Sequence, residues 1–176
     1  MGLTWDCIDF TRKRITVRHQ LQKTRGSGGV YELVSTKNGK IRVIAPAQYV
    51  MQLLERRRTE QAEDKLRVGS TWSNPLNLVF TDKVGGNLCA QTVYLHFKKI
   101  AKAIGVPSAR FHDLRHSYAV AALRSGDDIK TVQETLGHHT AAFTLDTYAH
   151  VTEQMRQDSA ARMDRFIDGL RNRKNA

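Results

Sequence analysis

Alternating apolar and polar positions dominate the first third of the chain and predict strands. The first strand is predicted over residues 14–21 and the second over residues 30–35. The glycine-rich run at 26–29 predicts the turn between them. A third strand is predicted over residues 41–45, directly after the Asn38-Gly39 dipeptide, which is typical of tight hairpin turns. The pattern therefore indicates a small three-stranded antiparallel sheet near the N-terminus.

A helical pattern replaces the alternation at Pro46 and fades near Gly69. The apolar positions that share one face of this predicted helix are Tyr49, Val50, Leu53 and Leu54. Residues 70–88 show no helical period and predict irregular structure, with a short strand at 78–80 and a turn at Gly85-Gly86.

Two further helices are predicted between residues 90 and 126. The apolar stripe of the first consists of Val93, Phe97, Ile100, Ala101 and Ile104, and the stripe of the second consists of Leu114, Tyr118, Ala121 and Ala122. Gly105 and Pro107 end the first helix, and Gly126 ends the second, because glycine and proline stop helices.

A short helix is predicted next, with Asp127 or Asp128 as its N-cap and Gly137 as a left-handed C-cap. Its apolar positions are Ile129, Val132 and Leu136. A helix around residues 143–148 and a last helix over 152–170 follow, the latter with an apolar face of Met163, Phe166, Ile167 and Leu170. Residues 171–176 are expected to form a flexible tail.

The order of these elements predicts an α+β fold that is mainly α-helical, with the small sheet packed on a helical bundle. A length of 176 residues suits one domain, which we place at residues 1–170. The two cysteines, Cys7 and Cys89, imply no disulfide framework. No run approaches the length needed to span a membrane, and no leader is recognisable, so we expect a cytoplasmic protein.

The charge of the chain gives information about its binding partner. The formal net charge is +11 and the pI is near 10.0. A small protein this basic usually meets a polyanion, and nucleic acid is the first expectation. A merely solubilising surface or a ribosome-like binder is the alternative that charge alone leaves open.

Candidate chemistry begins with His112 and Arg115, which are three residues apart at the predicted start of a helix. This spacing places both side chains on one face, and the free N–H groups of a helix N-terminus favour an anion. Arginine grips phosphate oxygens through paired hydrogen bonds, so the pair is suited to cradle a phosphate. The plainer interpretation is a capping histidine beside a surface arginine.

Three more residues are candidates through their places in the chain. His138 directly follows the predicted glycine stop, which fixes the direction in which its imidazole leaves. Tyr148 lies among polar residues, whereas the other tyrosines fit strands or apolar stripes. A phenol becomes a nucleophile beside cations or a base. Lys37 lies at the edge of the predicted hairpin turn, from which an ammonium group can donate a proton to a leaving oxygen.

The five candidates occur in an order and spacing that resemble the tyrosine recombinase family, which includes the phage integrases. The motifs that carry the resemblance are His112-Asp113-Leu114-Arg115-His116, Leu136-Gly137-His138 and Asp146-Thr147-Tyr148. The segment Gly2–Asp9 and the Leu78–Phe80 run before Gly85-Gly86 are similar to further parts of the family pattern. The resemblance covers residues 2 to about 151.

The resemblance implies an enzyme that breaks and rejoins DNA through a 3′-phosphotyrosyl intermediate, without metal or other cofactor. It implies that Tyr148 is the nucleophile, that Arg115 stabilises the transition state and that Lys37 protonates the leaving 5′ oxygen. His112 and His138 would assist proton transfer and phosphate binding. His116 and His150 match the family pattern too, and we interpret them as structural.

Double-stranded DNA is the implied partner, in a bacterial or phage-infected cell. The basic residues expected to contact DNA are Arg12, Lys13, Arg14, Lys40, Arg42 and Arg110. The helix at 152–170 resembles a segment through which relatives associate with a neighbouring subunit, so self-association on DNA is expected.

The family pattern has a second essential arginine in a helix ahead of the segment that begins here at Gly2. We therefore expect an N-terminally truncated catalytic domain that is weak or inactive alone. A DNA-binding remnant without chemistry is the alternative. A zinc hydrolase is a third hypothesis, because His112 and His116 are four apart and further histidines follow. It is disfavoured because no glutamate stands beside the pair to act as a base.

Overall fold

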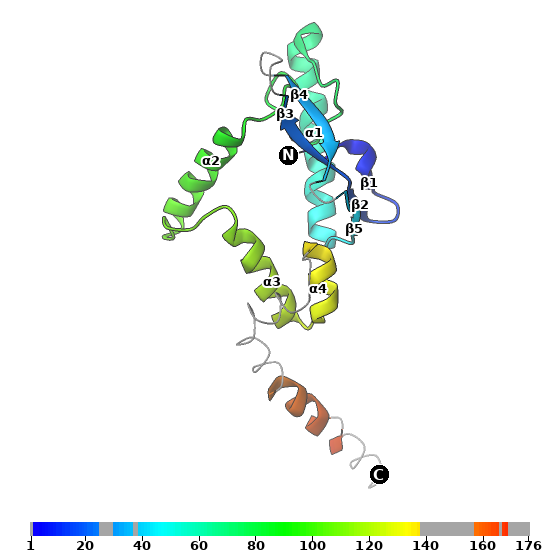
Figure 1. Cartoon of the computed structure of the whole chain (residues 1–176), viewed down its shortest axis with the longest axis vertical. Helices are drawn as coiled ribbons and strands as arrows, with labels where there is room; N and C mark the ends of the chain where they lie inside the picture. Colours follow the sequence, from blue (N-terminus) through cyan, green and yellow to red (C-terminus); the bar gives the residue numbers. More distant parts are fainter. Residues whose placement is uncertain (1, 25–29, 37–38, 138–156, 166, 169–176) are drawn as a thin grey trace. The chain divides into compact units, whose positions relative to one another are not determined.

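The computed structural model describes residues 2–24, 30–36, 39–137, 157–165 and 167–168. The chain forms two compact units, Met1–Pro107 and Ser108–Ala176. The fold is mainly helical with small antiparallel sheets, as the sequence predicts (Figure 1). No helix in the described part of the chain is long and apolar enough to cross a membrane.

The first unit contains a three-stranded antiparallel sheet and a separate two-stranded ladder. The three-stranded sheet has the order β1 (Ile8–Asp9), β2 (Arg14–Val17) and β5 (Arg42–Ile44). The ladder pairs β3 (His19–Lys23) with β4 (Tyr31–Ser35), and Leu21 lies opposite Leu33. The predicted hairpin between residues 14–21 and 30–35 is therefore confirmed in its second half.

Two details of the predicted sheet are wrong. The strand predicted over 14–21 is interrupted at Arg18, and its two halves belong to different ladders. The predicted third strand pairs with β2 rather than with the strand that precedes it in sequence. The turn signal was nevertheless real, because the Gly39 N–H donates to the Thr36 carbonyl at 2.7 Å and Gly39 has φ +62°. A turn residue fixes a change of direction but not which strand receives the returning chain.

The core of this unit joins the sheet to α1 (Gln48–Val68). Its buried members are Ile8, Met51, Leu54 and Val79, and Leu3, Trp5, Phe10 and Ile15 pack against them. The helix begins and ends as predicted. Its predicted apolar face is wrong except for Leu54, because Tyr49, Val50 and Leu53 are exposed. The buried face carries Met51, Leu54, Gln61 and Asp64 instead.

Polar side chains on the buried face of α1 hold the segment that follows it. The Gln61 side-chain amide donates to the Val79 carbonyl at 2.8 Å and accepts from the Trp5 indole N–H at 2.9 Å. Arg57 donates to the carbonyls of Val79 and Thr81, both at 3.2 Å. The strand predicted at 78–80 is only an isolated bridge between Thr4 and Leu78. Side chains of α1, rather than neighbouring strands, satisfy much of this backbone.

The predicted turn at Gly85-Gly86 is confirmed. Gly85 has φ +92°, and the Asp82 carboxylate accepts from the N–H groups of Val84 and Gly86 at 3.0 and 2.8 Å. A side chain at Gly85 would also meet the Ser73 carbonyl oxygen at 2.8 Å. Both the left-handed conformation and the close approach therefore require glycine at this position.

The helix α2 (Ala90–Ala103) confirms the predicted element but not its buried stripe. Ala101 is the one member of that stripe that is buried, while Ile100 and Ile104 are 61% and 69% exposed. The helix ends as predicted at Gly105, which has φ +81°. The helical period identified an amphipathic helix without showing which side of it is covered.

In the second unit, α3 (Asp113–Ser125) and α4 (Ile129–Leu136) form a helical hairpin. Its buried residues are Ala119, Ala122, Leu123, Val132 and Leu136. The predicted stripe of α4 is confirmed. That of α3 is wrong except for Ala122, since Leu114, Tyr118 and Ala121 are exposed.

The caps of the hairpin follow the predicted chemistry. Asp128, rather than Asp127, is the N-cap of α4, and its carboxylate accepts from the Thr131 N–H at 2.9 Å. Gly126 and Gly137 end α3 and α4 in the left-handed conformation, with φ +105° and +66°. These residues fix where each helix starts and stops.

Residues 157–165 and 167–168 are helical and exposed, within the range predicted for the last helix. Met163 and Ile167 are 57% and 41% exposed. The helix predicted around 143–148, the remaining apolar positions Phe166 and Leu170, and the predicted tail lie outside the described residues.

Candidate active site

The described part of the candidate site is the entry to α3. His112 is the N-cap residue, with φ −66° and ψ −25°, and its side chain makes no cap hydrogen bond. The Arg115 N–H donates to the His112 carbonyl at 3.0 Å, so the two residues lie within one turn. The predicted spacing is thus realised at a helix N-terminus, where backbone N–H groups and the dipole favour an anion. The plainer interpretation of His112 as a side-chain cap does not fit this geometry.

An ion pair that the sequence analysis missed lies beside His112. The Arg110 guanidinium donates to Asp113 Oδ1 from Nε at 3.1 Å and from Nη2 at 2.9 Å. The Arg110 backbone N–H also donates to Asp113 Oδ2, at 2.8 Å. Hydrogen bonds from the side chain and then the backbone of Arg110 lower the pKa of Asp113 below its usual value. An acid at the first position of a helix, three residues after an arginine, was the available signal.

His116, four residues after His112, lies one turn further along α3. The two imidazole rings meet edge to face, with centroids 5.2 Å apart. Within the described residues, no group of three or more His, Cys, Asp or Glu side chains is placed to hold a metal ion. His138, His139 and His150, which the zinc hypothesis also needs, lie outside the described residues.

The remaining candidates can be placed only by their neighbours. His138 follows Gly137, the left-handed C-cap of α4, and lies just outside the described residues together with Tyr148. Lys37 also lies outside them, between Thr36 and Gly39. The Thr36 hydroxyl donates to the Lys40 carbonyl at 2.9 Å. The described structure therefore brings together His112 and Arg115 and leaves the other three as predictions.

The predicted DNA-contact residues of the first unit occupy exposed turns and strands. Arg12, Lys13 and Arg14 lie in and beside the turn from β1 to β2, and Lys13 has φ +51°. The Arg12 guanidinium is 3.9 Å from the Asp9 carboxylate and its side chain is 76% exposed. Lys40 is exposed and precedes β5, which contains Arg42. Arg12, Lys13, Arg14 and Lys40 are exposed, whereas Arg42 is half-buried, and contact of all five with DNA stays a prediction.

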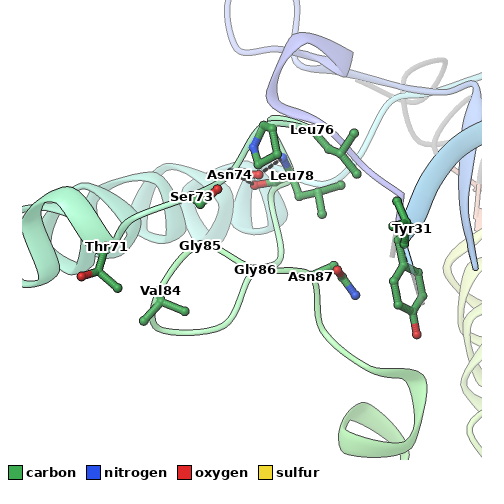
Figure 2. A pocket seen from close by; sticks show the side chains of 12 residues that line it. Tyr31, Thr71, Ser73, Asn74, Leu76, Leu78, Val84, Gly85, Gly86 and Asn87 are labelled. Atoms are coloured by element: carbon green, nitrogen blue, oxygen red, sulfur yellow. Dashed lines mark hydrogen bonds between the residues drawn. The ribbon is translucent and has the colours of Figure 1, made fainter. Parts of the chain in front are cut away.

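The first unit also contains a hollow of about 530 Å³, between β4 and the loops that follow α1. Figure 2 shows Tyr31 on one side of it and Thr71 and Val84 on the other. Its lining carries no charged side chain and none of the candidate catalytic residues. A phosphate requires cations or converging N–H donors, so this hollow is not a candidate for the phosphate site.

Comparisons with known proteins extend the resemblance found in the sequence. Residues 1–155 match the phage integrase family. The tyrosine recombinase XerC-like protein of Caldanaerobacter subterraneus subsp. tengcongensis is 31% identical, over 95% of this chain and 45% of its own length. The tyrosine recombinase XerD of Listeria monocytogenes is 35% identical, over 69% of this chain and 40% of its own length. The chain thus spans less than half the length of these relatives.

Solved structures agree on the fold. The Tn1549 transposon integrase in complex with transposon right end DNA matches with a TM-score of 0.70 and 23% identity, over 93% of this chain and 53% of that chain. The XerA recombinase matches with a TM-score of 0.63 and 21% identity, over 90% of this chain and 50% of that chain. Together with the match over residues 1–155, these findings establish that the chain belongs to the phage integrase family.

Proposed function

We propose that this chain acts in site-specific DNA recombination or integration, by cleaving and rejoining DNA strands through a 3′-phosphotyrosyl link. The observation that carries the proposal is the His112–Arg115 turn at the start of α3, in a chain that matches the phage integrase family over residues 1–155. The net charge of +11 supports DNA as the substrate.

The proposed reaction is a phosphoryl transfer in two steps. The Tyr148 phenolate oxygen attacks the phosphorus, the bond from phosphorus to the 5′ oxygen breaks, and Lys37 gives that oxygen a proton. A 5′-hydroxyl of a second strand then attacks the phosphotyrosyl link and releases Tyr148. The bond energy is conserved in the link, so no nucleotide triphosphate is required.

The remaining site residues act on charge and protons. Arg115 stabilises the charge that builds on the non-bridging oxygens, an effect that exceeds its effect on the ground state. His112 and His138 bind the phosphate and help proton transfer to and from the tyrosine and the 5′ oxygen.

The proposed partners are double-stranded DNA and further copies of the chain. Arg12, Lys13, Arg14, Lys40 and Arg42 are proposed to contact the DNA backbone, which releases counterions and makes binding sensitive to salt. Self-association on DNA is proposed through residues 152–170, since Met163 and Ile167 are exposed within the described part of that helix. The proposed place of action is the cytoplasm of a bacterial or phage-infected cell.

Covalent capture tests the proposal without knowledge of the target sequence. The chain is incubated with a pool of random-sequence duplexes nicked near the middle, so that the short strand released by cleavage diffuses away and the link cannot be reversed. Protein-linked DNA is recovered under denaturing conditions and sequenced. We expect adducts enriched in one sequence and attached at Tyr148.

The matched variants are Tyr148→Phe and Tyr94→Phe, the latter at an exposed tyrosine of α2. Adduct should vanish in the first and persist in the second. Binding of duplex without any adduct would instead support the DNA-binding remnant, and adduct that survives Tyr148→Phe would refute the assignment of the nucleophile.

A further inference from the structure

The turn that leads into α3 is closed by one side chain. The Asp113 carboxylate accepts from the Arg110 backbone N–H at 2.8 Å and from its guanidinium at 2.9 and 3.1 Å. The Asp113 N–H donates back to the Arg110 carbonyl at 2.9 Å. These contacts enclose Phe111 and His112 in a bracket that begins at Arg110 and ends at Asp113.

The bracket fixes the backbone conformation at the point where the side chains of His112 and Arg115 begin. The two residues inside the bracket accept the next hydrogen bonds of the chain: the Leu114 N–H donates to the Phe111 carbonyl at 3.4 Å, and the Arg115 N–H donates to the His112 carbonyl at 3.0 Å. The His112 imidazole makes no cap hydrogen bond, and the turn that contains His112 is held by the Asp113 carboxylate. His112 is therefore positioned by the hydrogen bonds of Asp113 and not by hydrogen bonds from its own side chain to the helix.

The same carboxylate poses an electrostatic problem for an anion site. Asp113 follows His112 directly and stands two residues before Arg115, so its negative charge lies beside the phosphate of the proposed reaction. Like charges in one site repel, and a bidentate guanidinium is the group best suited to cancel a carboxylate. Hydrogen bonds from Arg110 keep the pKa of Asp113 low, so the carboxylate is ionised and needs that partner.

We infer that Asp113 is a positioning residue for His112 and Arg115, and that Arg110 neutralises Asp113 instead of contacting the DNA backbone. The inference rests on the proposed function, because it assigns a role toward the same phosphate. It replaces the expectation from sequence that Arg110 contacts DNA. The Arg110 side chain is 76% exposed, so it is the bidentate pairing with Asp113, rather than burial, that assigns it this role.

The two interpretations differ in a double substitution. If Arg110 neutralises Asp113, Arg110→Ala leaves an unpaired carboxylate beside the phosphate and weakens phosphate binding. Adding Asp113→Asn removes that negative charge and restores the binding. Asparagine also keeps an oxygen that accepts the Arg110 backbone N–H. If Arg110 contacts DNA directly, the second substitution restores nothing.

The measurement uses the full chain and the duplex recovered by covalent capture, with affinity followed against salt concentration. Arg110→Ala should weaken binding roughly three- to tenfold, and Arg110→Ala/Asp113→Asn should return to within about twofold of the parent. Arg110→Lys should lie near the parent, because it keeps the charge. Equal weakening in the single and double variants, with the salt slope lowered by about one in both, would overturn the inference.

A second readout separates this inference from the proposed chemistry. The carbon-bound imidazole protons of His112 are followed by NMR during titration with inorganic phosphate, which needs no cleavage and no target sequence. The half-saturation concentration should rise in Arg110→Ala and fall back in the double variant. If the half-saturation concentration for phosphate at His112 is the same in all variants, Arg110 does not neutralise Asp113, whatever the outcome with DNA.

The control pair is Lys130 and Glu134, an exposed ion pair on α4 in the same unit, with 3.5 Å between Nζ and Oε1. Lys130→Ala and Lys130→Ala/Glu134→Gln should show no such rescue. Amide exchange along α3 checks that each variant keeps its helix. If Arg110→Ala loses α3, Arg110→Lys, Asp113→Asn and Asp113→Ala decide instead. The inference requires that Arg110→Lys and Asp113→Asn preserve phosphate binding at His112, and that Asp113→Ala, which lacks the oxygen that accepts the Arg110 N–H, bind phosphate more weakly than Asp113→Asn.

Discussion

Lys13 adopts a backbone conformation that side chains with a β-carbon rarely take, with φ +51° in the turn from β1 to β2. Asparagine tolerates this conformation better than lysine, so Lys13→Asn removes a charge without adding strain. We expect the melting temperature to stay level or rise, while affinity for DNA falls and the salt slope decreases by about one. Thermal melts and salt titrations measure both. Lys65→Asn, at an exposed position of α1, is the control and should keep the slope of the parent.

Asp128 gives a prediction about pH. The Thr131 hydroxyl, followed by the Thr131 backbone N–H, lowers the pKa of this N-cap carboxylate. A lowered pKa in the folded state means that the stabilisation is present above the unfolded-state pKa and is lost as the pH falls through the folded-state pKa. Asp128→Ala should therefore melt below the parent at neutral pH and approach it in acid. An offset that stays constant with pH would contradict this, and Asp127→Ala is the matched control.

The sequence predicted the conformation of single residues well where that conformation depends on the residue type alone. Gly39, Gly105, Gly126 and Gly137 all have positive φ at predicted turns or helix ends. It missed Asp113, because the role of a carboxylate depends on which cation lies within reach. The conformation of the turn at 110–113 decides that Arg110 is the cation beside Asp113, and no single residue of this turn predicts that conformation.

At the scale of elements, α1 depends on Gln61, which is 6% exposed. In Gln61→Ala, Arg57 still donates to the Val79 carbonyl, so the Trp5 indole N–H is the group that loses its partner. A buried polar group without a partner costs about 1–3 kcal/mol, and we expect a loss of roughly that size in the free energy of unfolding. Gln52→Ala, at an exposed glutamine of the same helix, should stay within about 0.5 kcal/mol of the parent. Urea denaturation compares them, and equal losses would show that Gln61 contributes only helix propensity.

The helix α1 also shows why the bounds of an element were easier to predict than the face that it buries. Its bounds followed from Pro46 and Gly69, which are local signals. Its buried face includes Gln61 and Asp64, polar residues that a search for apolar stripes passes over. Gln61 is buried because its amide donates to the carbonyls of Leu78 and Val79. Asp64 is buried because Arg67 and Lys83 approach its carboxylate at 2.9 and 3.4 Å. In α3 the apolar positions outnumber those that the hairpin covers, so the period alone did not select the buried side.

For the whole molecule, the proposed reaction needs a proton donor from residues near 37 and a transition-state stabiliser from α3. Replacing the bridging 5′ oxygen of the DNA with sulfur separates these roles. A thiol has a pKa near 8.5, so a thiolate leaves without a proton, whereas an alkoxide does not. Lys37→Ala should slow adduct formation about 10²–10⁴-fold with oxygen and much less with sulfur.

Arg115→Ala provides the contrast, because the charge on the non-bridging oxygens develops with either leaving group. We expect a loss of about 10²–10³-fold on both substrates. Lys40→Ala, a lysine of the same turn, should respond alike to both substrates and thus controls for lost DNA binding. Single-turnover rates of adduct formation are measured for the three variants, Lys37→Ala, Arg115→Ala and Lys40→Ala, on both the oxygen and the sulfur substrate, and each is compared with the parent. Equal losses of Lys37→Ala on oxygen and sulfur would mean that Lys37 binds DNA without donating the proton, and the donor would then have to be sought among His112 and His138.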